Sequence, residues 1–400
     1  MKEVAIVGIG ATRWGKYPDV SNQQLARGVI LQALTDANLA WNDIQLVVAG
    51  QDAYAGAPGI LAGAAIVEEM GFSGIPATTV QNGCATGTFT LDVGRAYILA
   101  GIYDVVLCVA AARSPGGFFP TPEGADDPGN LDFWRYRILG KTNPSMFAYQ
   151  AVRRMHNYGM TETDMAQVKV KNSKHGALNP IARYQKQFTL EEVMGSPMVA
   201  YPLHLFEVCA TSDGAAAVIL CSMKTARKLT TKSAILASVF SPQPKYPSLD
   251  IGLSFFSTHS TISTPASTPG VERPHEYEVC HGALEQAGIG PDDLDFAEVY
   301  DITTAMEFDW MEDIGICKPG EGEKLLWEGA TTIGGRVPIN TSGGVSSFGE
   351  AYPAQALVQV YELVTQVRGD AGPRQVEGAK VGIAANKGLG QSISSIVVKK

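Results

Sequence analysis

The chain lacks the charge pattern and the long apolar runs that mark nucleic-acid-binding and membrane proteins. Only 18% of its 400 residues are charged, and the formal net charge is −9. No basic stripe is present, which argues against a nucleic-acid partner. No apolar run reaches the length needed to span a bilayer. Residues 4–8 read as a buried strand and not as a charged segment followed by an apolar one, so we expect a cytoplasmic protein without a membrane partner.

Closely spaced cysteines are also absent. Six cysteines are scattered along the chain, at Cys84, Cys108, Cys209, Cys221, Cys280 and Cys317. This spacing excludes a zinc ribbon within the chain and provides no disulfide framework. We expect no metal site and no tightly bound cofactor. Hydrophobic residues make up 45% of the sequence, which is enough for two cores or one double core.

The most informative stretch that is present is Asn82-Gly83-Cys84-Ala85-Thr86-Gly87. It follows an apolar, strand-like segment and precedes a long amphipathic run. Cys84 is therefore predicted to lie at a strand-to-helix turn, where the new helix offers unpaired N–H groups. The positive end of a helix favours a thiolate, so Cys84 is a candidate nucleophile. The alternative is a small buried residue at a helix start.

One order of predicted elements occurs twice in the chain. Residues 33–44 and 283–294 each read as the end of a helix, a stop at Asn or Gly, and a turn that carries Asp43 or Asp293. A strand follows in both places. Chance similarity over one such unit is common, but the same order of elements twice indicates an internal duplication.

The duplication extends to the neighbourhood of Cys84. Cys84 and its helix have a counterpart in residues 340–344 and the helix predicted at 351–367, and each half closes with a strand, 215–221 or 392–399. Two such halves predict packed α/β layers related by a pseudo-dyad. We expect the Cys84 region to meet the region of Gly343 and Gly344.

We divide the chain into an N-terminal half, residues 1–225, and a C-terminal half, residues 226–400. An insertion at about 114–205 interrupts the first half and has Gly/Pro-rich ends. It concentrates positive charge, which is either a solvated helical face or a site for an anionic substrate; the residues are Lys169, Lys171, Lys174, Arg183 and Lys186.

With these motifs the chain resembles the thiolase superfamily over nearly its full length, in the branch of the sterol-carrier-protein-type thiolases. The resemblance implies a five-layered αβαβα core with a loop-domain insertion, a homodimer, and a CoA thioester as substrate. It also implies a small zinc-ribbon/OB-fold partner subunit. The motifs are 82–87, Ser212-Asp213-Gly214-Ala215-Ala216-Ala217, Tyr300-Asp301-Ile302-Thr303-Thr304, 312–322, Asn340-Thr341-Ser342-Gly343-Gly344 and Asn386-Lys387-Gly388-Leu389-Gly390-Gln391.

The chain departs from the family at three catalytic positions. Cys84 matches the acyl-accepting nucleophile, but the histidine of the family's Gly-His-Pro motif is replaced by Glu350. Asn386 occupies the position of the second cysteine and cannot transfer protons. Tyr300 occupies the site that helps to hold the thioester oxygen.

The substitutes define the candidate site. Burial would raise the pKa of Glu350 and let it act as base and then as acid, although a carboxylate at a helix N-terminus is an equal alternative. Tyr300 and Tyr352 can donate to a carbonyl or enolate oxygen, and His204 could supply an imidazole. The motifs add Gly388, Gly390 and Asn386 as oxyanion or backbone candidates. As substrate-binding candidates they add Asn340, Gly343, Gly344 and Ser212.

Three functions remain open from the sequence. The first is thiolytic cleavage of a β-ketoacyl-CoA through a Cys84 acyl-enzyme, with coenzyme A as co-substrate and a branched, aromatic or carboxylated acyl group, as in benzoylsuccinyl-CoA thiolases. The second is a retro-aldolase that cleaves a β-hydroxyacyl-CoA with Tyr300 and Tyr352 as acid and base. The third is a non-catalytic acyl-CoA-binding subunit. The retained Cys84 favours the first.

Overall fold

The structure, a computed structural model, describes residues 3–52, 62–114, 128–129, 143–229, 232–243, 275–388 and 392–400. Its strands form a nine-stranded mixed sheet in the order β3-β2-β4-β7-β1-β8-β11-β10-β9. The strands are β1 (Val4–Ala11), β2 (Leu46–Gly50), β3 (Ala77–Val80), β4 (Val105–Arg113), β7 (Asp213–Ser222), β8 (Ala234–Phe240), β9 (Phe296–Val299), β10 (Val381–Lys387) and β11 (Ile393–Lys399).

The sheet consists of two copies of one pattern. β2 is parallel to β4, which is antiparallel to β7, which is antiparallel to β1. In the same way β9 is parallel to β10, which is antiparallel to β11, which is antiparallel to β8. The copies join where β1 pairs with β8, with Val4 opposite Leu236. The prediction of a duplicated α/β fold is therefore confirmed.

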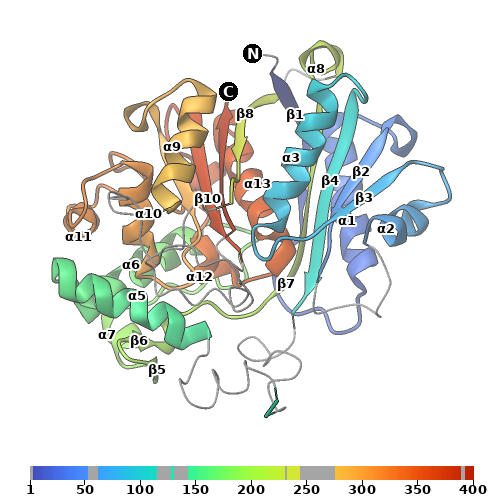
Figure 1. Ribbon diagram of the computed structural model, residues 1–400. Helices are drawn as coiled ribbons and strands as arrows, with labels where there is room; N and C mark the ends of the chain where they lie inside the picture. Colours follow the sequence, from blue (N-terminus) through green and yellow to red (C-terminus); the bar gives the residue numbers. More distant parts are fainter. Residues whose placement is uncertain are drawn as a thin grey trace.

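Helices form three layers around the two halves of the sheet (Figure 1). α3 (Thr86–Leu99) and α13 (Gln355–Arg368) lie between the halves and contact strands of both. α1 (Asn22–Ala37) and α2 (Ala62–Met70) cover the outer face of the first half, and α9 (His275–Ala287) covers that of the second. This is the predicted αβαβα order.

The repeated helix–turn–strand unit has the same geometry in both halves. α1 ends at Asn38, which is left-handed with φ 53°, and α9 is followed by Gly288 with φ 69°. In the short 3-10 turns that follow, η1 (Trp41–Asp43) and η4 (Pro291–Asp293), the aspartate accepts from the backbone N–H three residues earlier at 2.8 Å in each case. The two turns are thus built by one local rule.

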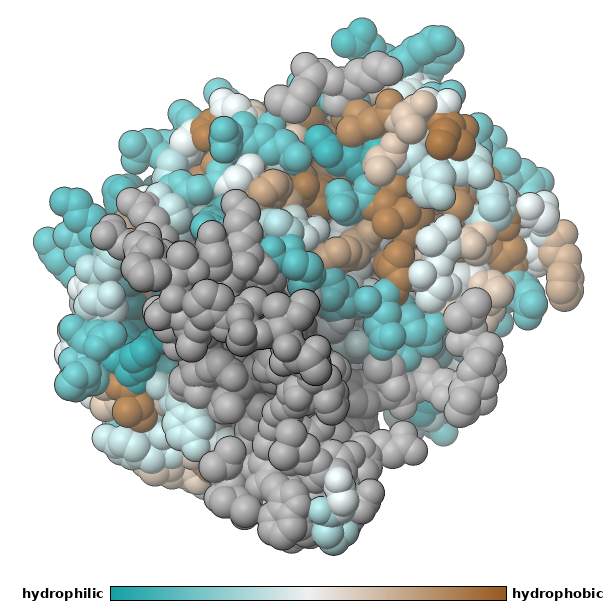
Figure 2. Space-filling view, in the orientation of Figure 1, coloured by the Kyte–Doolittle hydropathy of each residue, from teal (hydrophilic) through white to brown (hydrophobic). Residues whose placement is uncertain are grey.

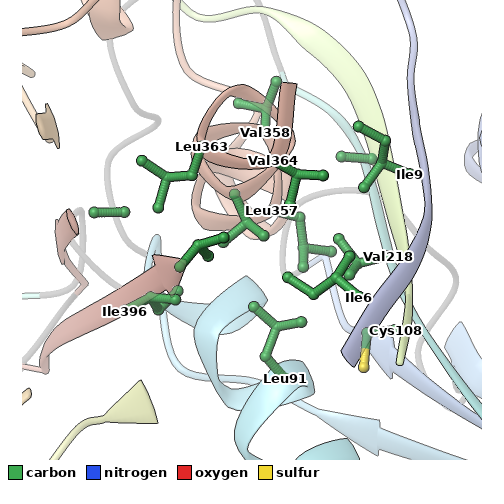
Figure 3. Close-up of a cluster of buried hydrophobic side chains, with 14 of the residues drawn as sticks. Ile6, Ile9, Leu91, Cys108, Val218, Leu357, Val358, Leu363, Val364 and Ile396 are labelled. Atoms are coloured by element: carbon green, nitrogen blue, oxygen red, sulfur yellow. The ribbon is translucent and has the colours of Figure 1, made fainter. Parts of the chain in front are cut away.

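The core lies between the two halves of the sheet (Figure 3). Leu91 of α3 and Leu357 of α13 pack there with Ile6, Val218 and Ile396 from strands of both halves. Both faces of these strands are covered, so β1 and nearly all of β7 are apolar along their length and do not alternate. Burial of this apolar surface holds the halves together.

The inserted segment contributes helices and a short hairpin beside the second half. They are α5 (Asn143–Tyr158), α6 (Glu162–Ala177), α7 (Leu190–Met194), β5 (Met198–Ala200) and β6 (Leu203–His204). α6 packs against α11 (Gly322–Trp327) and α12 (Gly344–Phe348). The predicted division near residue 225 falls in α8 (Met223–Leu229), and the domain limits remain a prediction.

Two of the basic side chains in the insertion are structural. Lys169 is buried and donates to the Ser346 carbonyl at 2.5 Å, and Lys171 is buried and pairs with Glu307 at 2.5 Å. These contacts attach α6 to the second half. Neither lysine lies on a solvated face, and both ammonium groups are already engaged by protein oxygens. Lys186 is exposed, lies in the connection between α6 and α7, and pairs with Glu192.

Candidate active site

Cys84 lies in the tight connection between β3 and α3. Gly83 is left-handed with φ 59°, and the Thr86 N–H donates to its carbonyl at 3.0 Å. The Thr86 hydroxyl accepts from the Asn82 N–H at 2.8 Å. Cys84 is 6% exposed. The turn therefore presents the thiol to the interior at the start of α3, as predicted.

The second half of the chain supports this turn. The Ser392 hydroxyl donates to Asn82 Oδ1 at 2.6 Å. A Cβ on Gly388 would lie 2.5 Å from the Asn82 carbonyl oxygen, so only glycine allows β10 to approach so closely. Gly388 thus has a structural role beside Cys84. Gly390, the neighbouring oxyanion candidate, lies outside the described residues.

Three reactive groups meet at Cys84. Tyr300 follows β9, and its hydroxyl donates a short hydrogen bond to Glu350 Oε1. The Glu350 carboxyl and the Tyr300 phenol both act on the pKa of the Cys84 thiol, so the three groups are neighbours. All three are almost fully buried. The structure therefore brings three of the candidate catalytic residues together.

Burial controls the protonation of this cluster. Burial raises the pKa of the Cys84 thiol well above its usual range, and the Glu350 charge raises it further. Burial also raises the pKa of Glu350 to about 7, against the lowering effect of its hydrogen bonds with Cys84 and Tyr300. The expectation of a thiolate favoured by the helix start is thus wrong for the resting site. A helix terminus contributes only about 0.3–1 kcal/mol, which desolvation exceeds.

Glu350 is held by backbone pairing and not by a helix terminus. Its N–H donates to the Ala210 carbonyl at 2.7 Å, and its carbonyl accepts from the Ser212 N–H at 2.9 Å. Gly349, left-handed with φ 72°, ends α12 just before it. A helical segment begins just after it, because the 3-10 turn Tyr352–Ala354 runs directly into α13. The Glu350 carboxyl accepts from Tyr300 and from no backbone N–H of that segment, so the structure shows no capping contact.

Tyr352 lies on the other side of the Cys84 turn. It belongs to a 3-10 turn, η5 (Tyr352–Ala354), and is buried. Its hydroxyl accepts from Gln81 Nε2 at 3.4 Å. It packs in the same hydrophobic cluster as Cys84 and Tyr300. η5 also contacts α3, so it is one of several parts of the second half that meet the Cys84 region.

The structure does not bring His204 into this cluster. Its ring Nδ1 is 2.7 Å from the Ser196 carbonyl, and its Nε2 is 3.5 Å from Glu162. Its backbone N–H donates to Glu207. All of these partners belong to the insertion, which gives His204 a structural setting.

Two of the substrate-binding candidates are engaged within the protein. Asn340 accepts from the Val299 N–H at 2.8 Å and donates to Glu307 at 3.1 Å. The Ser212 hydroxyl donates to the Phe348 carbonyl at 2.7 Å. Both residues are fully buried. These contacts position the loop that leads to Glu350, and a role in substrate binding remains a prediction.

Neighbouring atoms fill the space beside the Cα of each of the two glycine candidates. A Cβ on Gly343 would lie 2.5 Å from the Gly176 Cα, and one on Gly344 would lie 2.5 Å from an Asp301 oxygen. They permit close packing of the loop against α6 and Asp301. Val345, next to Gly344, belongs to the same hydrophobic cluster as Cys84, and a direct contact of the two glycines with the Cys84 turn stays a prediction.

One neighbour of the site was missed by the sequence reasoning. Cys209 is buried, its N–H donates to the Ile302 carbonyl at 2.9 Å, and its thiol interacts electrostatically with Cys84 and Glu350. Its position three residues before Ser212-Asp213-Gly214 was the available signal. Burial raises its pKa well above the usual range, so it is a neutral neighbour.

Among the described residues no group of His, Cys, Asp and Glu side chains is arranged to hold a metal ion. Within the same residues, no helix is both long enough and apolar enough to cross a membrane. The fold and the site together define an α/β enzyme with a buried cysteine between two duplicated halves.

Comparison with known proteins identifies the family. Residues 267–400 match the model described as thiolase C-terminal domain-like. The chain is 32% identical to an acetyl-CoA acetyltransferase of Methanothermobacter thermautotrophicus over 97% of both proteins. It is 29% identical to the benzoylsuccinyl-CoA thiolase subunit BbsB of Thauera aromatica over 94% of this chain and 92% of that one. The chain belongs to the thiolase family, and the names of these relatives support an acyltransferase.

Solved structures agree with this assignment. The Ltp2-ChsH2(DUF35) aldolase is 29% identical, with a TM-score of 0.80 over 99% of this chain and 97% of that one. Human mitochondrial 3-ketoacyl-CoA thiolase is 16% identical, with a TM-score of 0.71 over 99% and 98%. The second likeness shows the fold, and the predicted thiolase fold is confirmed.

Proposed function

We propose that the protein is a thiolase that cleaves a β-ketoacyl-CoA with CoA, through an acyl group carried on Cys84. The observation that carries this proposal is the buried cluster of Cys84, Glu350 and Tyr300. A thiol beside a carboxyl with a pKa of about 7 has a base available near neutral pH. The names of the acetyltransferase and BbsB relatives support the same chemistry.

Glu350 would move the protons of both half-reactions. In the first, it takes the Cys84 proton while sulfur attacks the β-keto carbon. The bond between the α and β carbons breaks, and the released enolate of acetyl-CoA takes a proton from Glu350. In the second, CoA attacks the Cys84 thioester, Glu350 takes the CoA thiol proton, and the departing Cys84 sulfur takes that proton back. The Tyr300 hydroxyl donates a hydrogen bond to Glu350 Oε1, so Oε2 is the oxygen that is free to take and give these protons.

A retro-aldolase is the second candidate, and the bond between Tyr300 and Glu350 favours it. A phenol and a carboxyl in contact can take the proton of a β-hydroxyl while the bond between the α and β carbons breaks, and can then return that proton to the α carbon of the released enolate. The products are a carbonyl compound and a shorter acyl-CoA, and no nucleophile is needed. The 29% identical aldolase structure supports this alternative.

The acyl group is proposed to be branched, aromatic or carboxylated, with CoA as co-substrate. Loss of the family histidine and second cysteine implies a rearranged transfer of protons, which suits a β-keto acid other than a simple straight chain. The name of the BbsB relative supports an aromatic, carboxylated example.

A homodimer is part of the proposal. β3 is an edge strand whose residues are only half-buried. Beside it, Phe89, Val93 and Ala96 of α3 are half-buried or exposed. Figure 2 shows hydrophobic side chains gathered over the region where Figure 1 places α3. A second copy that pairs along β3 would cover both features.

A small zinc-ribbon/OB-fold partner and a cytoplasmic location complete the proposal. The description of one similar structure as a complex with a DUF35 component, and of BbsB as a subunit, supports a partner.

The test is the intact mass of the protein after brief mixing with β-ketoacyl-CoA and β-hydroxyacyl-CoA donors, with Cys84→Ala as control. An acyl adduct on Cys84 that free CoA removes is the expected result. Release of a ketone or aldehyde by the Cys84→Ala protein would instead establish the retro-aldolase. The same assay on the chain alone and with the protein encoded beside it tests the partner, since full activity of the isolated chain contradicts an obligatory one.

A further inference from the structure

A buried amide pair lies in the interior near Cys84. Gln359 Nε2 donates to the carbonyls of Glu298 and Ala385 at 3.3 and 3.2 Å. Its Oε1 therefore faces Asn386, whose Nδ2 donates to it at 2.9 Å. Carbonyl oxygens only accept hydrogen bonds, so a flip of the Gln359 amide would place its Oε1 against the two carbonyls. A flip of the Asn386 amide would place its Oδ1 against Gln359 Oε1. The Asn386 Oδ1 position is thereby determined.

Asn386 Oδ1 has no hydrogen-bond partner among the described residues, and the residue is 1% exposed. One of the two N–H groups of its amide donates to Gln359, and the role of oxyanion donor that the sequence suggested for the side chain stays a prediction. A buried acceptor without a hydrogen-bond donor lowers the stability of the folded state. Such an oxygen is instead suited to a ligand that donates a hydrogen bond.

The position of Asn386 in the sheet directs its side chain toward the connection that carries Cys84. It lies opposite Ser394 in the β10–β11 pair, so the two side chains share a face. The Ser394 hydroxyl is 2.8 Å from the Thr88 hydroxyl in the first turn of α3. Two residues after Asn386, Gly388 packs against Asn82. Asn386 thus approaches the start of α3, where Cys84 lies.

Two further buried oxygens there lack partners among the described residues. One is Glu350 Oε2 in the Cys84 cluster, and the other is Oε1 of Gln355. Gln355 stands one turn before Gln359 on α13 and so on the same face. The interior around Cys84 is therefore rich in free acceptors.

We propose that Asn386 Oδ1 determines specificity by accepting a hydrogen bond from a hydroxyl on the acyl group, close to the carbons that react. This rests on the proposed function, because it requires an acyl-CoA at Cys84. A keto oxygen or a carboxylate placed against Oδ1 would present only lone pairs and be repelled there, so these groups of the proposed β-ketoacyl-CoA point away from Asn386. A hydroxyl donates to it and can accept from Gln355 or from protonated Glu350.

The test uses Cys84→Ala protein, which binds without acyl transfer, and calorimetric titration with 3-hydroxybutyryl-CoA and butyryl-CoA. We expect the hydroxylated ligand to bind about tenfold more tightly, as for one buried hydrogen bond. In Asn386→Leu the preference should fall to within about twofold.

Two glutamine variants on α13 separate orientation from general damage. Gln359→Met frees the Asn386 amide to turn and should weaken the preference. Gln366 is equally buried on the same helix and bonds to Glu362 and Arg374 instead, so Gln366→Met should retain it. Equal binding of the two ligands by the parent, or full preference in Asn386→Leu, would overturn the subsite. If neither acyl-CoA binds, the proposed function fails as well.

Discussion

At the scale of single residues, the site is defined by the burial of a carboxyl and a thiol away from solvent. Glu350 and Cys84 are ordinary residues in sequence, and their chemistry changes because both are buried side by side. Burial disfavours the charged form of each, so the cluster rests near neutral pH with the thiol protonated and Glu350 close to its midpoint. The carboxyl can then accept the thiol proton when substrate arrives.

The residue-scale prediction concerns Glu350→Gln. Loss of the base should lower kcat about 10²–10⁴-fold. In the unmodified enzyme kcat/KM should rise as pH passes through about 7, because Glu350 must be ionised to accept the thiol proton. That rising limb should vanish from the residual activity of the variant, as measured in steady-state kinetics from pH 5.5 to 8.5.

Glu207→Gln provides the matched control. Glu207 is fully buried, and burial also raises its pKa to about 7, but it lies beside His204 in the insertion. This variant should keep the rising limb. A limb that survives in Glu350→Gln and disappears in Glu207→Gln would assign the base elsewhere.

At the scale of elements, the short backbone pairings position the chemistry. Glu350 is fixed by a strand-like bridge to residue 211, and Tyr300 by a bond from its N–H to the Ala385 carbonyl at 3.0 Å. Both supports come from segments far away in the chain. The edge strand β3, which leads into the Cys84 turn, lacks a neighbour on its outer side among the described strands.

The element-scale prediction is that β3 joins two copies of the chain. The Val47 N–H donates to the Pro76 carbonyl, and the Gln51 N–H donates to the Val80 carbonyl. Because every second residue of a parallel strand bonds to the same neighbour, the N–H of Ala77 points away from β2. Ala77→Pro should therefore leave the β2–β3 pairing intact and convert a dimer into a monomer, as measured by sedimentation velocity.

Thr78→Val serves as the control, because it retains the backbone N–H groups. It should remain dimeric at the same concentration. A dimer of unchanged affinity in Ala77→Pro, with unchanged circular dichroism, would place the interface elsewhere.

At the scale of the whole molecule, buried carboxyls make stability depend on pH. Glu298 accepts from Ser342 and Thr341 and lies near Glu362, and burial with that second charge raises its pKa to about 8. Burial raises the pKa of Asp301 and Glu350 to about 7. These groups bind protons more tightly in the folded state than in the unfolded chain.

The free energy of unfolding should therefore fall as pH rises from 6.5 to 8. The folded state holds more protons over this range, so the stabilisation present at low pH is lost as each folded pKa is passed. Each group contributes at most about 1.4 kcal/mol per pH unit. Urea unfolding followed by circular dichroism measures this slope.

Glu298→Gln removes one such group and should make the slope shallower. Lys186→Met, which breaks an exposed ion pair, should leave it unchanged. A free energy of unfolding that rises over the same range in the parent protein would contradict the assignment.

The sequence by itself determined the elements and their duplication. The aspartate turns at Asp43 and Asp293, the left-handed stops at Asn38 and Gly288, and the glycine before Cys84 are local rules, because each depends on backbone groups a few residues away. The repeated order of helices and strands predicted the layers. Cys84, Glu350 and Tyr300 could be proposed from motifs alone.

Only the tertiary structure decided what those residues can do. Burial, which sets the pKa of Cys84 and Glu350, is a property of the assembled halves and leaves no mark in the spacing. The turn of Asn386 toward Gln359, the separation of His204 from the cluster, and the packing of Gly343 against α6 likewise depend on contacts between distant segments. The motifs thus identified the candidate catalytic residues, and the exclusion of water in the folded chain determines whether their pKa values rise or fall.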